Sequence, residues 1–233
     1  MKSIAIITAR GGSKRIPRKN IKEFLGTPIL AYSIKAALEA GCFDEVMVST
    51  DDQEIADIAI NYGAKVPFFR SESTSGDFAT TADVLREVLT EYKNRGLDFD
   101  MACVMYPTAP FITAEKLSKA IDILKREDVD SVLSMVKYSF PPQRAFVADD
   151  NFIRFAQPEF ARTRSQDLQP YYHDCGQFCC FKTDMFLEKN TLVTDRTYGL
   201  VMPETEVQDI DTFEDWEIAE IKYSIMKKKM EAK

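Results

Sequence analysis

The sequence lacks the features that mark several common classes of protein. It has one histidine, His173, and no hydrophobic run approaching the roughly 20 residues needed to cross a bilayer. It shows no internal repeat and no low-complexity segment, and its first residues predict a strand instead of a secretory signal. We therefore expect one globular domain with no membrane-spanning segment. A lone histidine is more often structural than catalytic, so His173 alone does not indicate a catalytic site.

Cysteines form an odd set, and their spacing matches no zinc site. The five are Cys42, Cys103, Cys175, Cys179 and Cys180. Several lie in apolar runs, where a free cysteine behaves as a small hydrophobic residue, so the pattern predicts a reduced, cytoplasmic protein. The formal net charge of -7 argues against nucleic acid as a partner.

Positive charge is concentrated in one stretch of this acidic chain, residues 9–20. Ten consecutive residues of it contain five cations, namely Arg10, Lys14, Arg15, Arg18 and Lys19. The stretch follows an apolar run at 4–7 and precedes a helix predicted from Pro28 to residue 38. Strand, glycine-containing turn and helix are how α/β proteins present backbone N–H groups to a phosphate.

A solvated basic loop is the alternative interpretation of such a cationic run. The preceding strand favours phosphate binding, as do Gly11 and Gly12, which permit left-handed φ angles and close approach of the backbone to a ligand. The spacing matches neither a P-loop nor the G-x-G-x-x-G dinucleotide fingerprint.

Short apolar segments alternate with segments of helical periodicity along most of the chain. The pattern predicts strands at 4–7, 44–52, 66–70, 100–106, 131–136, 171–181 and 199–203, and helices at 29–38, 53–62, 83–92, 113–126 and from 215 onward. This alternation predicts a mostly parallel sheet with right-handed crossovers. Ligands of such sheets bind beyond the carboxyl ends of the strands, so Arg10, Asp51 and Arg70 are expected to converge.

Residues 137–169 break this pattern, because prolines interrupt the segment and no helical period survives. Its aromatic residues are Tyr138, Phe140, Phe146, Phe152, Phe155 and Phe160. Short strands are expected, with a hairpin turn at 149–151. The aromatic side chains either pack onto the parent domain or bury against a second subunit, and composition leaves both open. We therefore predict a core formed by 1–136 and 170–233, with 137–169 as an insertion.

Two aspartates, Asp209 and Asp211, precede the last predicted helix. Alternate residues of an extended segment point to the same side, so both carboxylates can face one ion. A hard oxygen site with few protein ligands suits Mg²⁺ shared with phosphates. Alternatively, Asp211 or Thr212 caps the helix, which accounts for one aspartate but not for the second.

The stretch 9–20 resembles the signature of the sugar-activating nucleotidyltransferases, and within them the CMP-acidic-sugar synthetases, a cytidylyltransferase group. The resemblance rests on Ala9-Arg10-Gly11-Gly12-Ser13-Lys14, Pro17 and Lys19-Asn20, and it extends over the chain through 48–52, 106–110, 164–167 and Asp209-Ile210-Asp211. It implies a three-layer Rossmann-like α/β fold and a homodimer formed through the insertion.

The resemblance also implies transfer of CMP from CTP to the anomeric hydroxyl of an acidic sugar, with release of pyrophosphate. Nucleotide-binding residues would be Ala9, Arg10, Gly11, Gly12, Ser13, Asn20, Arg70 and Thr81. Arg10, Lys14 and Lys19 would neutralise the charge that grows on the leaving pyrophosphate. Mg²⁺ would bind Asp209 and Asp211. No general base stands out, since His173 and a metal-bound hydroxyl would serve equally well.

Within the group, the fit is closest to the pseudaminic acid cytidylyltransferases, through 141–144 and 173–177. The residues that would contact the sugar are Tyr106, Arg164, His173 and Gln177. Tyr106 and His173 stand where the sialic acid enzymes carry Gln and Arg, so a nine-carbon nonulosonic acid such as pseudaminic acid is expected before sialic acid or an octulosonic acid.

Two other functions remain open at this point. A hexose-1-phosphate nucleotidyltransferase would place an Asp after the central strand, where this chain has Thr108. A non-catalytic nucleotide-binding protein would not require the loop cations together with both Asp209 and Asp211.

Overall fold

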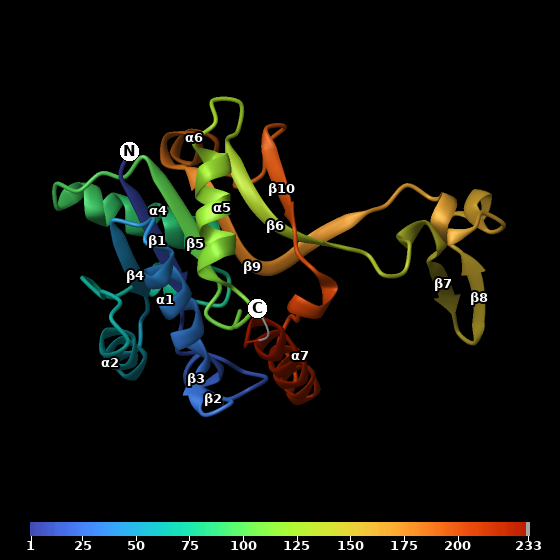
Figure 1. Cartoon of the computed structure of the whole chain (residues 1–233), viewed down its shortest axis with the longest axis horizontal. Helices are drawn as coiled ribbons and strands as arrows, with labels where there is room; N and C mark the ends of the chain where they lie inside the picture. The colour runs from blue at the N-terminus through green and yellow to red at the C-terminus, as the bar shows by residue number, and fades with distance from the viewer. Residues whose placement is uncertain (232–233) are drawn as a thin grey trace.

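A six-stranded sheet forms the centre of the computed structural model, which describes residues 1–231 (Figure 1). The strands are β1 (Ser3–Thr8), β4 (Glu45–Ser49), β5 (Met101–Met105), β6 (Ser131–Lys137), β9 (Tyr172–Lys182) and β10 (Thr197–Val201). Their order is β10-β6-β9-β5-β1-β4, and only β9 pairs antiparallel, with both β5 and β6. The predicted mostly parallel sheet is confirmed.

Helices cover both faces of the sheet, which gives the predicted three layers. They are α1 (Ile29–Ala40), α2 (Gln53–Asn61), the single turn α3 (Glu72–Ser75), α4 (Thr81–Asn94), α5 (Ala114–Leu124), α6 (Thr183–Lys189) and α7 (Phe213–Glu231). One apolar cluster joins α1, α2 and α5 to the sheet, and a second joins α4 and α6 to its other face. Alternate side chains of each strand enter opposite clusters, as the pleat requires.

Helix starts follow the local chemistry of the sequence. The Thr113 hydroxyl accepts from the Lys116 N–H, so Thr113 is the predicted N-cap of α5. Thr80 and Asp83 form a capping box at the start of α4. At the C-terminal end, α7 packs against β2 (Glu23–Phe24), which pairs with β3 (Thr27–Pro28), and Trp216 lies edge-on to Phe24 at 5.6 Å between ring centroids. No helix within residues 1–231 is long and apolar enough to cross a membrane.

The strand predicted at 66–70 is wrong. Pairing here is limited to an isolated bridge between Met47 and Lys65. Pro67 has no N–H to donate to a ladder, so the chain leaves the sheet edge after Lys65. Arg70 still lies at the carboxyl end of the sheet, as predicted, because its backbone N–H donates to the Thr50 carbonyl at 2.8 Å, just beyond β4.

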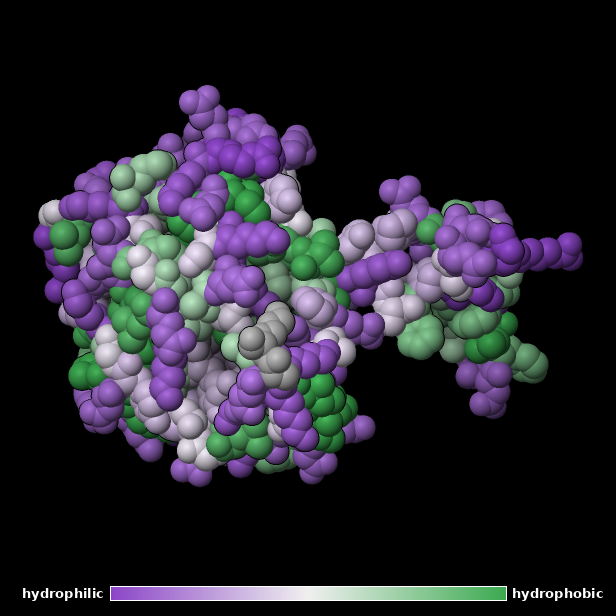
Figure 2. Space-filling model, in the orientation of Figure 1, coloured by the Kyte–Doolittle hydropathy of each residue, from purple (hydrophilic) through white to green (hydrophobic). Residues whose placement is uncertain are grey.

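The segment 137–169 leaves the body of the protein as an arm (Figure 1). Its tip is the predicted hairpin, formed by β7 (Phe146–Asp149) and β8 (Phe152–Phe155), with Asp150 left-handed at φ 49° in the turn. Hydrophobic side chains gather on the surface of the arm (Figure 2), and Phe152 is 82% exposed. In this chain, Phe140, Phe146 and Phe152 therefore do not pack onto the parent domain.

Candidate active site

The basic loop after β1 is held by its own backbone and by the end of β4. The Ala9 N–H donates to the Ser49 carbonyl at 2.9 Å, and the Gly11 N–H donates to Asp51 Oδ1 at 2.9 Å. The Asn20 side-chain amide closes the loop by donating to the Arg10 carbonyl at 2.8 Å. The loop is therefore preorganised by hydrogen bonds that use none of its cationic side chains.

Gly11 is required by space and not by backbone conformation. A Cβ at this position would lie 2.8 Å from Asp52 Oδ2, whereas a Cβ at Gly12 would meet nothing within 4 Å. Neither glycine has a positive φ, so the left-handed freedom that glycine permits is not used at either position. Asp52 itself is fixed by Arg18, whose hydrogen bond holds the pKa of the Asp52 carboxyl below its usual range.

A cavity of about 490 Å³ opens between this loop and the carboxyl ends of β1 and β5. Eight of the predicted site residues line it, namely Arg10, Ser13, Lys14, Lys19, Asn20, Arg70, Thr81 and Tyr106. Ala9, by contrast, is fully buried beneath the loop. The volume lies in the range of about 300–1,000 Å³ that is typical of small-molecule sites.

Sequence reasoning missed several residues in the cavity wall. They are Thr8, Arg15, Ile16, Ala79, Thr80, Val84, Pro107 and Thr108. Arg15 was recognisable as a loop cation, and Pro107 and Thr108 belong to the motif at 106–110. Ala79 and Thr80 carry no comparable signal, because the tertiary fold alone brings the start of α4 against the loop.

Arg70 contributes a partly buried cation to the cavity. Its Nε donates to Ser49 Oγ at 3.0 Å and its Nη2 donates to the Ser49 carbonyl at 2.8 Å. Burial lowers the pKa of the Arg70 guanidinium, because desolvation penalises the charged form. A guanidinium keeps its charge even so, and the two bonds fix its plane against the end of β4.

Tyr106 lines the same cavity from the end of β5. Its backbone is held on two sides, because the Ser33 hydroxyl donates to the Tyr106 carbonyl at 2.9 Å and the Tyr106 N–H donates to the Gln177 carbonyl at 3.0 Å. Burial, and then the negative charge of Asp174, raise the pKa of the Tyr106 phenol, so it stays neutral at physiological pH.

The other predicted sugar-contacting residues do not line this cavity. Gln177 is only 2% exposed, and its Nε2 donates to the Glu206 carbonyl at 2.6 Å while its Oε1 has no partner among residues 1–231. His173 stacks on Tyr138, with ring centroids 4.5 Å apart, at the base of the arm. Arg164 lies on the arm itself and pairs with Asp167 at 2.7 Å. A single chain therefore does not bring the four residues together.

The two aspartates before α7 lie beside the basic loop. Lys19 Nζ donates to the Ile210 carbonyl at 2.5 Å and lies 3.5 Å from Asp211 Oδ1, and Arg15 Nη2 is 2.7 Å from the same oxygen. The helix cap is Thr212, whose hydroxyl accepts from the Asp215 N–H at 3.2 Å while Asp215 Oδ2 accepts from the Thr212 N–H at 2.8 Å. The carboxylates of Asp209 and Asp211 therefore take no part in capping α7.

The Asp209 carboxylate has fewer polar partners than the Asp211 carboxylate. Partial burial, and then the charge of Asp211, raise its pKa, and within residues 1–231 no donor bonds to its carboxylate. A cation beside Asp209 would offset the repulsion between the two neighbouring carboxylates. The described residues contain no group of three or more His, Cys, Asp or Glu that could hold a metal alone. The pair therefore fits a Mg²⁺ ion that takes its other ligands from phosphates and water.

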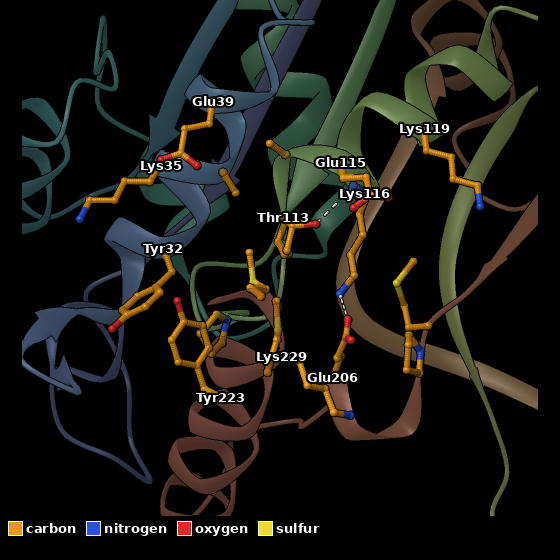
Figure 3. Close-up of a pocket in the computed structure, with 18 of the residues that line it drawn as sticks. Tyr32, Lys35, Glu39, Thr113, Glu115, Lys116, Lys119, Glu206, Tyr223 and Lys229 are labelled. Atoms are coloured by element: carbon orange, nitrogen blue, oxygen red, sulfur yellow. Dashed lines mark hydrogen bonds and ion pairs between the residues drawn. The ribbon is translucent and has the colours of Figure 1, made fainter. Parts of the chain in front are cut away.

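A larger cavity, of about 790 Å³, lies between α1, α5, α7 and β10 (Figure 3). No predicted site residue lines it. Lys116 and Glu206 form an ion pair of 2.8 Å across it, and Glu206 also accepts from Gln177 through its backbone carbonyl. This cavity therefore borders the segment that leads to Asp209 but contains neither the basic loop after β1 nor the aspartate pair.

Comparison with known proteins identifies close relatives over the whole chain. The cytidylyltransferase family model matches residues 4–228. The chain is 38% identical to the pseudaminic acid cytidylyltransferase of Campylobacter jejuni serotype O:2 over 226 residues, which cover 97% of both proteins. It is 33% identical to the CMP-N,N'-diacetyllegionaminic acid synthase of Legionella pneumophila, with 94% of this chain and 95% of that protein covered.

Solved structures support the fold independently. The structure of a CMP:2-keto-3-deoxy-manno-octonic acid synthetase complexed with CTP superimposes with a TM-score of 0.69 at 17% identity, covering 98% of this chain and 100% of the other. This likeness confirms the predicted Rossmann-like fold. With the family model matched along nearly its full length and a relative at 38% identity, this chain belongs to the cytidylyltransferase family.

Proposed function

We propose that this chain transfers CMP from CTP to the anomeric hydroxyl of pseudaminic acid, giving the CMP-sugar and pyrophosphate. The observation that carries the proposal is the cavity in which Arg10, Lys14 and Lys19 meet Arg70 and Tyr106. It occurs in a chain with 38% identity to a pseudaminic acid cytidylyltransferase. Thr108 lines the same cavity where a hexose-1-phosphate nucleotidyltransferase would carry an Asp, so that alternative is not favoured.

The reaction needs positioning and neutralisation of charge more than covalent catalysis. The sugar hydroxyl oxygen bonds to the α-phosphorus and loses its proton to solvent, the bond from that phosphorus to the bridging oxygen breaks, and the electron pair leaves on pyrophosphate. Arg10, Lys14 and Lys19 line the same cavity and are proposed to neutralise the charge that grows there. The preorganised loop requires little rearrangement for this role.

A second group of residues in the same cavity is assigned to the base of the nucleotide. Asn20, Arg70 and Thr81 are proposed to recognise cytosine. The Asn20 amide nitrogen is already engaged with the Arg10 carbonyl, so its Oδ1 is the atom left to accept from an amino group. Arg70 is oriented by Ser49 and supplies a fixed donor.

Asp209 and Asp211 are proposed to hold Mg²⁺, which would neutralise phosphate charge and orient the triphosphate when bound. Lys19 connects the two parts of the site, because its ammonium bonds the Ile210 carbonyl between the two aspartates while its stem lines the cavity. The protein therefore presents the carboxylate pair and the loop cations as one unit.

Sugar choice is tested by measuring pyrophosphate release from CTP with pseudaminic acid, sialic acid and an octulosonic acid in turn. We expect efficient turnover of pseudaminic acid and poor turnover of the other two. Tyr106 and His173 offer a flatter and less cationic surface than an amide and a guanidinium, which suits a sugar with acylamino groups in place of some hydroxyls. Turnover of sialic acid as fast as pseudaminic acid would overturn the assignment of the sugar and leave cytidylyl transfer standing.

The double variant Tyr106→Gln with His173→Arg should erode this preference. Each replacement introduces the polar group found in the sialic acid enzymes, so the ratio of kcat/KM for pseudaminic acid to that for sialic acid should fall. Pyrophosphate release with both sugars measures the ratio. An unchanged ratio would mean that these two side chains do not contact the ring substituents.

We also propose that the chain acts as a homodimer joined through the arm at 137–169. The exposed aromatic side chains of β7 and β8 support this, because a monomer would leave them in water. The arm carries Arg164 away from its own cavity, so an exchange of arms would let Arg164 reach the sugar bound by a second copy. The five unpaired cysteines favour a cytoplasmic location.

Phe152→Glu is expected to convert this dimer to a monomer. The Phe152 side chain is 82% exposed in one chain, so the charge does not disturb the fold of the protomer but opposes its burial in an interface. Sedimentation or light scattering gives the mass. Ile60→Glu on α2 is the matched control, since Ile60 is also an exposed apolar residue, and this variant should leave the mass unchanged. A dimeric Phe152→Glu protein would place the interface elsewhere.

A further inference from the structure

The carboxylate of Asp77 forms ion pairs with Arg10 and Lys14, two loop cations that the proposed function assigns to the triphosphate. Asp77 Oδ1 lies 2.9 Å from Arg10 Nη1, and Asp77 Oδ2 lies 2.5 Å from Lys14 Nζ. Lys14 first, and then Arg10, hold the pKa of Asp77 below its usual range, so the carboxylate is ionised at neutral pH. Each of its oxygens is therefore paired with one cation, as two oxygens of a phosphate would be.

The segment that carries Asp77 is anchored at both ends. At its start, the Ser71 N–H donates to Glu87 Oε1 at 2.8 Å. At its end, the Thr80 N–H donates to Asp83 Oδ2 at 2.9 Å within the capping box of α4. Between the anchors, Phe78 is fully exposed and packs on nothing. Arg10 Nη1 also donates to the Gly76 carbonyl at 3.4 Å, so the bonds of Asp77 and Gly76 to the loop cations hold the middle of the segment.

The same segment forms part of the cavity wall. Ala79, Thr80 and Thr81 line the cavity together with the cations that Asp77 contacts. Breaking the Asp77 ion pairs would therefore free both the cations and the wall beside them. The ion pairs are exposed to solvent, where such contacts are weak and are readily exchanged for a stronger anion.

We infer that Asp77 is an internal competitor of the triphosphate: its carboxylate neutralises Arg10 and Lys14 in the free protein, is displaced by CTP, and returns as pyrophosphate leaves. The inference rests on the proposed function, because it takes these cations as the triphosphate site. A triphosphate carries several negative charges against one on Asp77, so it wins the competition, whereas a weakly charged anion does not. Asp77 thereby makes binding selective for polyphosphates and opposes product retention.

A structural role for Asp77 predicts the opposite result. If the carboxylate only positions Arg10 and Lys14 for the ligand, its loss disorders them and weakens binding. If it competes with the ligand, its loss strengthens binding. Asp77→Asn separates the two, because the amide keeps the size of the side chain and one of its two acceptor oxygens, but removes the charge.

The test measures binding of CTP and of inorganic pyrophosphate to the full chain by titration calorimetry, which requires neither sugar nor turnover. We expect Asp77→Asn to bind both about two- to tenfold more tightly than the parent, the range for loss of two exposed ion pairs. The gain should shrink as the salt concentration rises, because salt screens exposed charges. Asp77→Glu, which keeps the charge, should bind close to the parent.

Asp122→Asn is the matched control, since it removes one exposed carboxylate from α5, and it should not change either affinity. Equal or weaker binding by Asp77→Asn, in a parent that binds CTP, would overturn the role of Asp77 alone. A parent that binds neither CTP nor pyrophosphate would overturn this inference and the proposed function together.

Discussion

Asp209→Asn and Asp211→Asn are each expected to abolish Mg²⁺-dependent CMP transfer without unfolding the protein. The amide keeps the shape of the side chain but removes the charge that a hard cation requires. The cap of α7 is formed by Thr212 and Asp215, so the helix does not depend on either residue. Pyrophosphate release at a series of Mg²⁺ concentrations measures the loss, and thermal unfolding followed by circular dichroism checks the fold.

The two variants differ in what else they remove. Asp211→Asn also loses the contact with Arg15, a solvent-exposed ion pair that contributes little to stability. Asp209 has no such partner within residues 1–231, so Asp209→Asn is the cleaner test. Asp122→Asn, at an exposed position on α5, should retain parental turnover. If Asp209→Asn retained turnover within a few-fold of the parent at limiting Mg²⁺, the proposed metal site would be wrong.

Lys19→Ala should lower kcat by roughly 10²-fold, the typical cost of losing one preorganised donor to a developing charge. Lys19 is well placed for this effect, because its side chain is only 20% exposed and its ammonium is held at the Ile210 carbonyl. A partly desolvated, oriented cation interacts more strongly with the departing pyrophosphate than a mobile surface lysine does. Steady-state kinetics with CTP varied at saturating sugar give kcat and KM separately.

Two controls separate the possible roles of Lys19. Lys93→Ala, in the last turn of α4, removes an exposed lysine outside the cavity and should leave both kinetic constants unchanged. If Lys19 only holds the segment that carries Asp209 and Asp211, excess Mg²⁺ should restore turnover to Lys19→Ala. A rise in the KM for CTP with kcat unchanged would indicate uniform binding and contradict a role in the transition state.

Local patterns in the sequence were enough to predict most of the elements of this fold. The buried run at 4–7, the Thr113 cap and the turn at 149–151 depend on neighbours within a few residues, and the structure confirms each of them. The cationic loop after the first strand was equally local, so its position at the carboxyl end of the sheet followed from the βα alternation.

Predictions that relied on pattern without tertiary context were weaker. The apolar run at 66–70 looked like a strand, but Pro67 and the isolated bridge at Lys65 keep it out of the sheet. The sequence showed only that Gly11 and Gly12 permit left-handed φ angles and close approach, whereas the actual constraint on Gly11 is the side chain of Asp52. Spacing along the chain cannot reveal a contact between residues 41 positions apart.

The sequence by itself determined the α/β class, the basic loop and the aspartate pair, because periodicity, glycines and charge are properties of short segments. Only the tertiary structure decided that Lys19 reaches Ile210, 191 residues away, and that Asp77 pairs with Arg10 and Lys14. It also decided that the arm carries Arg164 away from the cavity of its own chain. Such contacts arise from the packing of whole elements, and the free energy that selects them comes from the burial of the core and not from the residues of the site.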